Sequence, residues 1–395
     1  MVHKIGIIGL GSRGSWWLEY LIKREDIELT AVCDEYADRV EEAVHLAQSK
    51  GIRSIRYAGT DYRDILNRKE IEIAFILTAW ESHIPLAVDF MNAGIVTAME
   101  VGGAYTLEDC YRLVREQEKT GTAFFLMENC CYGKREMMIR NMVNHNAFGE
   151  IVHCQGCYGH DLREEITQGL KNRHYRYRNY LRRNCDNYPT HELGPIARIL
   201  NINHGNRMLS LTSTASRAAG LVAYLREKGE EKQLPTFAQG DIVNTVIKCA
   251  GGETILLTLD TCLPRPYGRG LQVRGTKGMY MEETDMVYLD DRHYPQYELD
   301  ARPLWGNAKE FEEEYLAQPW KDEVDVSEGH GGMDGLMISD FLRCLEQGLP
   351  MPIDVYDAAA WMSISCLSEE SVRKGGAPVA IPDFTGGRWL LESEK

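Results

Sequence analysis

The 395-residue chain is long enough for two packed domains with a large hydrophobic core, because a domain usually takes about 150 residues. Its 44 Lys and Arg and 59 Asp and Glu give a net charge of −15, which repels polyanions and argues against a nucleic-acid partner. Eleven cysteines, an odd number scattered along the chain, favour reduced thiols over a disulfide framework, and we predict no metal site. No stretch approaches the roughly 20 apolar residues of a membrane helix, so we expect a soluble, cytoplasmic protein without a membrane partner.

The first residues predict a strand, a tight turn and a helix. Residues 5–8 are typical of a buried strand, and glycines follow at the spacing G-x-G-x-x-G. Glycine at these positions allows the turn, the approach of a pyrophosphate to the backbone, and close packing of helix on strand. We therefore predict a dinucleotide site, with an ordinary strand-to-helix loop as the alternative. The candidate cofactor residues in this turn are Gly9, Gly11, Ser12, Arg13 and Gly14.

An acidic residue follows at the offset expected for a ribose ligand. A second predicted strand, residues 29–33, ends at Asp34, which comes 20 residues after Gly14. A carboxylate there binds the ribose hydroxyls of NAD and repels the 2′-phosphate of NADP. We therefore predict NAD as the preferred cofactor.

Strands and helices alternate up to residue 125, which predicts a right-handed, doubly wound parallel sheet as a first domain over residues 1–125. Ligands of such sheets bind at the carboxyl ends of the strands. The predicted strand 71–77 is followed by Thr78, Trp80 and His83, and the predicted strand 95–99 is followed by Glu100. These four residues are further cofactor candidates. For His83, a histidine bonded to the backbone at a helix start is an equally weighted alternative.

Beyond residue 125 strands dominate, and we predict a second, α+β domain over residues 126–395 with an open, mostly antiparallel sheet. An exposed face of that sheet suits a homo-oligomer, by analogy of fold. Residues 275–278 are typical of a hairpin turn. Residues 163–183 are rich in Arg and Tyr, which fits either a solvated loop or a loop that binds a polar ligand such as a sugar.

Three clusters in the second half carry candidate chemistry. Glu128 and Tyr132 follow the last predicted parallel strand, where a carboxylate can act as base or ligand. Tyr188 and His191 lie three residues apart, with Thr190 as a predicted helix cap, and can meet on one side of the first turn. A phenol beside an imidazole is a suitable unit for proton transfer near neutral pH, and a capped helix with a backbone-bonded histidine is the alternative. The third cluster comprises the loops 263–267 and 329–334, whose unusual composition fits either a site or ordinary turns. The sequence contains neither the G-x-S-x-G nor the H-E-x-x-H motif, so it does not indicate a serine hydrolase or a zinc enzyme.

These motifs resemble those of the Gfo/Idh/MocA oxidoreductase superfamily and, within it, glycoside hydrolase family 109, the NAD-dependent α-N-acetylgalactosaminidases. The first likeness rests on the glycine fingerprint, residues 78–83 and Glu100; the second rests on residues 127–133, 158–163, 188–191, 265–267 and 330–334. Dehydrogenases of the superfamily carry Glu-Lys-Pro where this chain has Glu100-Val101-Gly102, so the usual lysine is missing. Two residues depart from the family pattern. Glu192 stands where we expect a glycine, and Gly159 stands where we expect a larger residue.

The resemblance implies a Rossmann domain followed by an α/β domain, and a redox-neutral hydrolysis. Transient oxidation at C3 of the sugar acidifies C2, the C1 substituent leaves by elimination, water adds, and C3 is reduced again. It implies Tyr188 and His191 as catalytic residues, Asn129 as a further cofactor residue, and a sugar site formed by Glu128, Tyr158, Arg176 and Tyr267. The alternatives are an NAD-dependent sugar or inositol dehydrogenase and a nucleotide sensor without catalysis.

Overall fold

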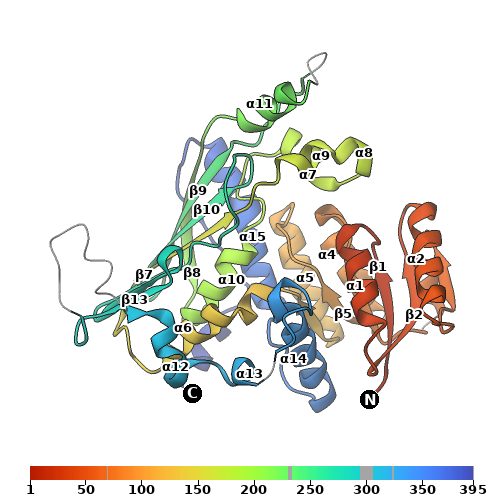
Figure 1. Ribbon diagram of the computed structural model, residues 1–395, viewed down its shortest axis with the longest axis horizontal. Helices are drawn as coiled ribbons and strands as arrows, with labels where there is room; N and C mark the ends of the chain where they lie inside the picture. The colour runs from red at the N-terminus through yellow and green to blue at the C-terminus, as the bar shows by residue number, and fades with distance from the viewer. Residues whose placement is uncertain (69, 230–233, 294–305, 323, 395) are drawn as a thin grey trace. The chain divides into compact units, whose positions relative to one another are not determined.

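The computed structural model describes residues 1–68, 70–229, 234–293, 306–322 and 324–394. The chain divides into two compact units (Figure 1). The first comprises residues 1–127 and 337–359, and the second comprises residues 128–336 and 360–395. From the sequence we predicted that the first domain ends at residue 125, and we predicted no later segment that returns to it.

The first unit is built on a six-stranded sheet in the order β3-β2-β1-β4-β5-β6, with all neighbouring strands parallel. This order confirms the predicted doubly wound fold. Apolar runs form the central strands because both sheet faces are covered, and Ile5, Ile73 and Phe75 are fully buried. The strands are β1 (His3–Ile8), β2 (Ile27–Cys33), β3 (Tyr57–Gly59), β4 (Ile73–Ile76), β5 (Val96–Met99) and β6 (Phe124–Leu126).

Helices connect these strands and mostly follow the predicted positions. They are α1 (Ser12–Leu21), α2 (Ala37–Ser49), α3 (Arg63–Arg68), α4 (Trp80–Asn92) and α5 (Leu107–Thr120). Thr106 caps α5 as predicted, because its Oγ1 accepts the backbone N–H of Asp109 at 3.1 Å. The short β3 and α3 were not predicted, since each is too brief to show a period.

A late segment of the chain completes the first unit. Phe341 of α14 (Met333–Gln347) stacks on Phe125, with ring centroids 4.9 Å apart, and contacts Phe75 at 6.5 Å. The backbone N–H of Leu126 donates to the carbonyl of Ile353 at 3.1 Å. The edge strand β6 is therefore covered by residues more than 200 positions later in the sequence.

The second unit contains a nine-stranded sheet in the order β14-β13-β12-β11-β7-β10-β9-β8-β15. Only the β7–β10 pair is parallel, which confirms the predicted mostly antiparallel sheet. The β11–β12 hairpin turns at the predicted place. The strands are β7 (Ile151–Gly159), β8 (Met208–Ala215), β9 (Ile242–Cys249), β10 (Thr254–Asp260), β11 (Gln272–Gly275), β12 (Gly278–Met281), β13 (Met286–Leu289), β14 (Gly306–Asn307) and β15 (Val379–Ala380).

Helices of the second unit bring the candidate residues onto this sheet, and α10 packs directly on β7. Residues 163–183, which we predicted as a loop, form short helices instead. The helices are η1 (Asn129–Tyr132), α6 (Lys134–Asn144), α7 (Arg163–Thr167), α8 (Gly169–Asn172), α9 (Tyr175–Arg182), α10 (Thr190–Ile199), α11 (Gly220–Glu227), η2 (Glu282–Thr284), η4 (Ala308–Phe311), α12 (Glu312–Tyr315), α13 (Gln318–Lys321), η5 (His330–Gly332), α15 (Val355–Arg373) and η6 (Arg388–Glu394). Within the described ranges, no helix combines the length and apolar character that a bilayer span requires.

All eleven cysteines are free, and ten of them are buried. Cys154 and Cys157 have the C-x-x-C spacing, but both lie on strand β7, where residues three apart point to opposite faces of the sheet. Burial raises the pKa of Cys157 to about 11. These thiols are therefore packed side chains rather than a redox or metal pair.

Candidate active site

The glycine turn between β1 and α1 has the geometry that a dinucleotide needs. Gly9 adopts a positive φ of 98°, which favours glycine, and its N–H donates to the Cys33 carbonyl at 2.8 Å. A Cβ on Gly14 would collide with the backbone of Gly9, whereas a Cβ on Gly11 would meet only the Arg39 guanidinium, at 3.8 Å. Gly14 thus serves helix–strand packing, and Gly11 keeps an open approach to the start of α1.

Asp34 is oriented by the backbone at the end of β2. Its Oδ2 accepts the N–H of Leu10 at 2.7 Å, and its Oδ1 accepts the N–H of Tyr36 at 3.0 Å. The carboxylate is 7% exposed. Each oxygen keeps a further lone pair, which is what two ribose hydroxyls would use. The open turn at Gly11 and this fixed acid together fit an NAD molecule.

Glu100 and Arg13 form a bonded pair in the first unit. Arg13 Nε donates to Glu100 Oε1 at 2.7 Å, and Trp17 Nε1 donates to the same oxygen at 3.1 Å. The Arg13 guanidinium also lies 4.8 Å from the ring centroids of Trp16 and Trp17. Ser12 begins α1 beside Arg13. These contacts fix Arg13 at the helix start, where the phosphates of a dinucleotide bind.

The residues after β4 pack tightly within the same unit. His83 is 1% exposed, and its Nε2 lies 2.9 Å from the carbonyl oxygen of Thr78, which is the backbone-bonded arrangement we left open. Burial lowers the pKa of His83, so the ring is neutral. Trp80 is 3% exposed, and its indole occupies the place that a side chain at Gly102 would need. This contact explains why glycine stands two residues after Glu100.

In the second unit, Tyr188, His191 and Glu128 form a line of hydrogen bonds. Tyr188 Oη lies 3.4 Å from His191 Nε2, and His191 Nδ1 lies 2.8 Å from Glu128 Oε1. The predicted pairing of Tyr188 with His191 is present, and Glu128 joins it from 63 positions earlier. The predicted cap is wrong: Pro189 already has helical angles, so Thr190 lies inside the first turn of α10, which no side chain caps.

The environment keeps Glu128 charged although it is fully buried. Burial by itself raises the pKa of this carboxyl, but the His191 ring and hydrogen bonds from His191 and the Cys130 N–H outweigh it. The pKa of Glu128 therefore lies below its ordinary value. A fixed negative charge beside Nδ1 orients the His191 ring and leaves Nε2 facing Tyr188.

Tyr158 and Arg176 lie against this line. The Tyr158 ring centroid is 4.5 Å from that of Tyr188 and 5.5 Å from that of His191. Arg176 is 7% exposed, and its guanidinium lies 5.0 Å from the Tyr188 ring centroid. Burial raises the pKa of Tyr158 to about 12, against the opposing effect of Arg176. The phenol is thus a hydrogen-bond donor at neutral pH.

Tyr267 and Asn129 occupy the margins of this group. Tyr267 is half exposed, and its hydroxyl accepts from Arg269 Nη1 at 3.4 Å. The His160 ring centroid lies 5.2 Å from that of Tyr267 and 6.2 Å from that of Tyr158, so His160 links Tyr267 to the group. Asn129 is buried and belongs to the second unit, and its Nδ2 donates to Asp334 Oδ1 at 2.8 Å.

His330 and Asp334 form a second histidine–carboxylate pair, which was not predicted from the sequence. His330 Nδ1 lies 2.8 Å from Oδ2 of Asp334, whose side chain is fully buried, while His330 is about half exposed. Residues 329–332 all have positive φ, including His330 at 44°, a conformation that costs energy for a non-glycine residue. The i, i+4 spacing of His330 and Asp334 beside three glycines is the signal that could have identified it.

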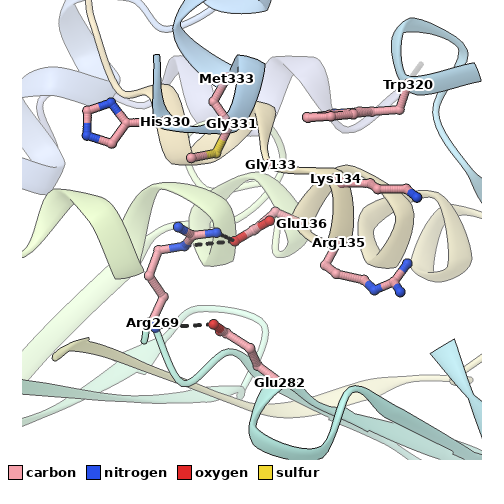
Figure 2. A pocket seen from close by; sticks show the side chains of 10 residues that line it. All are labelled: Gly133, Lys134, Arg135, Glu136, Arg269, Glu282, Trp320, His330, Gly331 and Met333. Carbon is pink, nitrogen blue, oxygen red and sulfur yellow. Dashed lines mark hydrogen bonds and ion pairs between the residues drawn. The ribbon is translucent and has the colours of Figure 1, made fainter. Parts of the chain in front are cut away.

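His330 lines a cavity of about 260 Å³ within the second unit. Figure 2 shows the Arg269 guanidinium directed at Glu136, with Met333 and the Trp320 ring on the opposite wall. Arg269 and Glu136 form a close ion pair, and Trp320 Nε1 donates to the Tyr132 carbonyl at 2.9 Å. The cavity therefore combines charged and aromatic walls, which suits a polar organic ligand.

Glu128, Cys130 and His191 are close enough to be considered as metal ligands, because their ligand atoms lie within 4.8 Å of one another. Burial raises the pKa of the Cys130 thiol well above its usual value. A neutral thiol is a poor ligand, and Glu128 and His191 already bond each other. The donor chemistry favours a hydrogen-bonded cluster.

Comparisons with known proteins identify the family of the chain. Residues 3–128 match the oxidoreductase family with an NAD-binding Rossmann fold, and residues 132–391 match the glycosyl hydrolase 109 C-terminal domain. The chain belongs to glycosyl hydrolase family 109. A family 109 protein of Stenotrophomonas maltophilia (strain K279a) is 36% identical, covering 98% of this chain and 90% of its own. An alpha-N-acetylgalactosaminidase of Tannerella forsythia is also 36% identical, covering 98% and 87%.

Solved structures share the fold of this family 109 chain at low identity. Levoglucosan dehydrogenase in complex with NADH and L-sorbose superposes with a TM-score of 0.74 at 16% identity, covering 97% of this chain and 100% of its own. The myo-inositol 2-dehydrogenase of Lactobacillus plantarum gives 0.67 at 15%, with the same coverage. The first unit is an NAD-binding Rossmann domain, and the glycine turn and Asp34 are the parts of it that fit the cofactor.

Proposed function

We propose that this protein is an NAD-dependent glycosidase that acts on α-N-acetylgalactosaminides or closely related glycosides. The observation that carries the proposal is the Tyr188–His191–Glu128 line, with Tyr188 and His191 in the family 109 domain of a chain that also carries an NAD-binding domain. The name of the Tannerella forsythia relative supports the choice of sugar. The missing lysine at Val101 argues against ordinary alcohol oxidation as the net reaction.

Bound NAD supplies a reversible oxidation at C3 of the sugar, after which the C2 proton is acidic enough for a modest base. His191 and Tyr188 transfer protons at C2 and at the C3 hydroxyl. Glu128 holds His191 through Nδ1, so that Nε2 is the nitrogen that takes and returns a proton. Arg176 and Tyr158 bind sugar oxygens, since one is a fixed cation and the other a protonated phenol.

His330 is the candidate proton donor for the leaving group. The buried carboxylate of Asp334 holds its Nδ1, so Nε2 is the nitrogen that exchanges a proton with a ligand. His330 is among the residues that line the 260 Å³ cavity, and this cavity is where we place the departing group. The positive φ of His330, 44°, is a strained conformation for a non-glycine residue and is typical of a functional site.

The second candidate function is a sugar or inositol dehydrogenase, because the solved structures with the same fold bear such names. The two functions differ in their cofactor balance. A glycosidase needs NAD only in catalytic amount and accumulates no NADH, whereas a dehydrogenase reduces NAD in proportion to the sugar consumed.

The test is to incubate purified protein with substoichiometric NAD+ and an aryl α-N-acetylgalactosaminide, and separately with free sugars. We expect release of the phenol over many turnovers without a rise in NADH absorbance, and a loss of at least about 10²-fold in rate for His191→Ala and Tyr188→Phe. Both variants should still bind NAD. Stoichiometric NADH from free sugar would establish the dehydrogenase instead, and NAD binding without either reaction would establish a sensor.

A further inference from the structure

An arginine stands beside the acid that binds the adenosine ribose. Arg39, in the first turn of α2, places Nη1 3.6 Å from Asp34 Oδ2. The same nitrogen lies 3.8 Å from the position that a Cβ on Gly11 would take. Its guanidinium also lies 4.9 Å from the ring centroid of Tyr36. Arg39 therefore spans from the ribose acid to the open turn that a dinucleotide covers.

Asp34 does not depend on this arginine for its orientation. The backbone N–H groups of Leu10 and Tyr36 already hold its two oxygens. The orientation of Asp34 therefore does not require Arg39, whose side chain is 19% exposed. Arg39 can in addition contact the group of the bound cofactor that lies between Asp34 and Gly11.

The group at that place which differs between cofactors is the 2′ substituent of the ribose. A hydroxyl is neutral and suits Asp34, whereas a 2′-phosphate is a dianion that Asp34 repels. A guanidinium is planar, always charged, and bonds phosphate oxygens through two N–H groups. Arg39 therefore offsets the repulsion that the sequence alone led us to expect from Asp34.

We propose that Arg39 reads the 2′ position of the bound dinucleotide, so that this site binds the 2′-phosphorylated cofactor NADP as well as NAD. The proposal concerns the NAD-binding unit alone. It stands or falls independently of the glycosidase reaction, because its test measures binding and not turnover.

The test is a calorimetric titration of the full-length protein with NAD and with NADP. We expect NADP to bind within about 100-fold of NAD, and Arg39→Ala to weaken NADP by about 10- to 100-fold while NAD changes by less than about threefold. Arg39→Lys should lie between the two for NADP. Arg115→Ala is the matched control, since it removes the same charge from an exposed position of the same unit.

A second variant separates the charge effect from a structural one. Asp34→Asn removes the repulsion, so it should strengthen NADP binding when Arg39 is present and much less in the double variant with Arg39→Ala. Equal weakening of both cofactors by Arg39→Ala would show that Arg39 only supports the adenosine half. Undetectable NADP binding at millimolar concentration, or no change for either cofactor, would overturn the proposal.

Discussion

Glu128 Oε1 lies 2.8 Å from His191 Nδ1, and both groups are buried. Residue 128 follows the last parallel strand of the first unit, whereas His191 belongs to the first turn of α10. Gly194, one turn after His191, makes this approach possible, because a Cβ there would lie 2.9 Å from Glu128 Cγ. A histidine that is oriented in this way presents its other nitrogen to Tyr188.

The first prediction concerns Glu128. Glu128→Gln keeps the shape but replaces the carboxylate that orients His191 through Nδ1, so turnover of an aryl glycoside should fall by about 10- to 100-fold. NAD affinity, measured by titration, should not change. Glu108→Gln, at a position of α5 where the side chain is 71% exposed, is the control. Full activity in the Glu128 variant would show that His191 works without its carboxylate.

The second prediction separates the role of His330 from that of His191. A proton donor to the leaving group matters most when that group is a poor one. His330→Ala should therefore slow an alkyl or disaccharide glycoside by about 10²-fold or more and an activated nitrophenyl glycoside much less. His191→Ala should slow both alike. An equal effect of His330→Ala on the two substrates would remove it from leaving-group protonation.

The third prediction contrasts two glycines of the nucleotide turn. Gly14→Ala drives a Cβ into the backbone of Gly9, so the melting temperature should fall by several degrees and NAD binding should be lost. Gly11→Ala meets only the Arg39 side chain, at 3.8 Å, so the fold should keep its stability while NAD binds more weakly. Thermal unfolding with and without NAD measures both. Similar melting temperatures for the two variants would contradict this division of roles.

The fourth prediction concerns Asp186, which is fully buried. Burial raises the pKa of its carboxyl to about 7 from an ordinary value of 3.8. The folded state therefore retains the proton, and the stability that this group contributes is present below about pH 4 and is lost as the pH rises towards 7. Asp186→Asn should thus unfold at a higher temperature than the parent at pH 8, with the gap shrinking towards pH 4. A gap that does not depend on pH would show that the carboxyl does not titrate there.

Local patterns predicted most of the first unit. Apolar strands, the helical stripe of residues 37–49 and the Thr106 cap are encoded within a few residues of where they act. The return of residues 337–359 to the first unit has no such signal, because it depends on Phe341 meeting Phe125 across more than 200 residues. Residues 163–183 looked like a loop because their Arg and Tyr lack an apolar stripe, yet Arg176 is buried by aromatic rings.

The candidate site also combines features that short sequence patterns predict with contacts that only the folded chain brings together. Tyr188 and His191 could be paired from their spacing, but their contact with Glu128 is a property of the folded chain. Gly159 and Glu192, the two residues that depart from the family pattern, also contact neighbouring residues. The Arg265 guanidinium occupies the place where a side chain at Gly159 would begin, and Glu192 packs its Cβ against Gly156. Burial raises the pKa of the Glu192 carboxyl well above its ordinary value.

The most direct test of the account is the fate of the hydrogen at C2 of the sugar. The protein is incubated with catalytic NAD+ and an aryl α-N-acetylgalactosaminide in D2O, and the released sugar is analysed by NMR and mass spectrometry. Elimination after transient oxidation predicts deuterium at C2 in every product molecule, with no net NADH. Hydrolysis that leaves hydrogen at C2 would contradict the central claim.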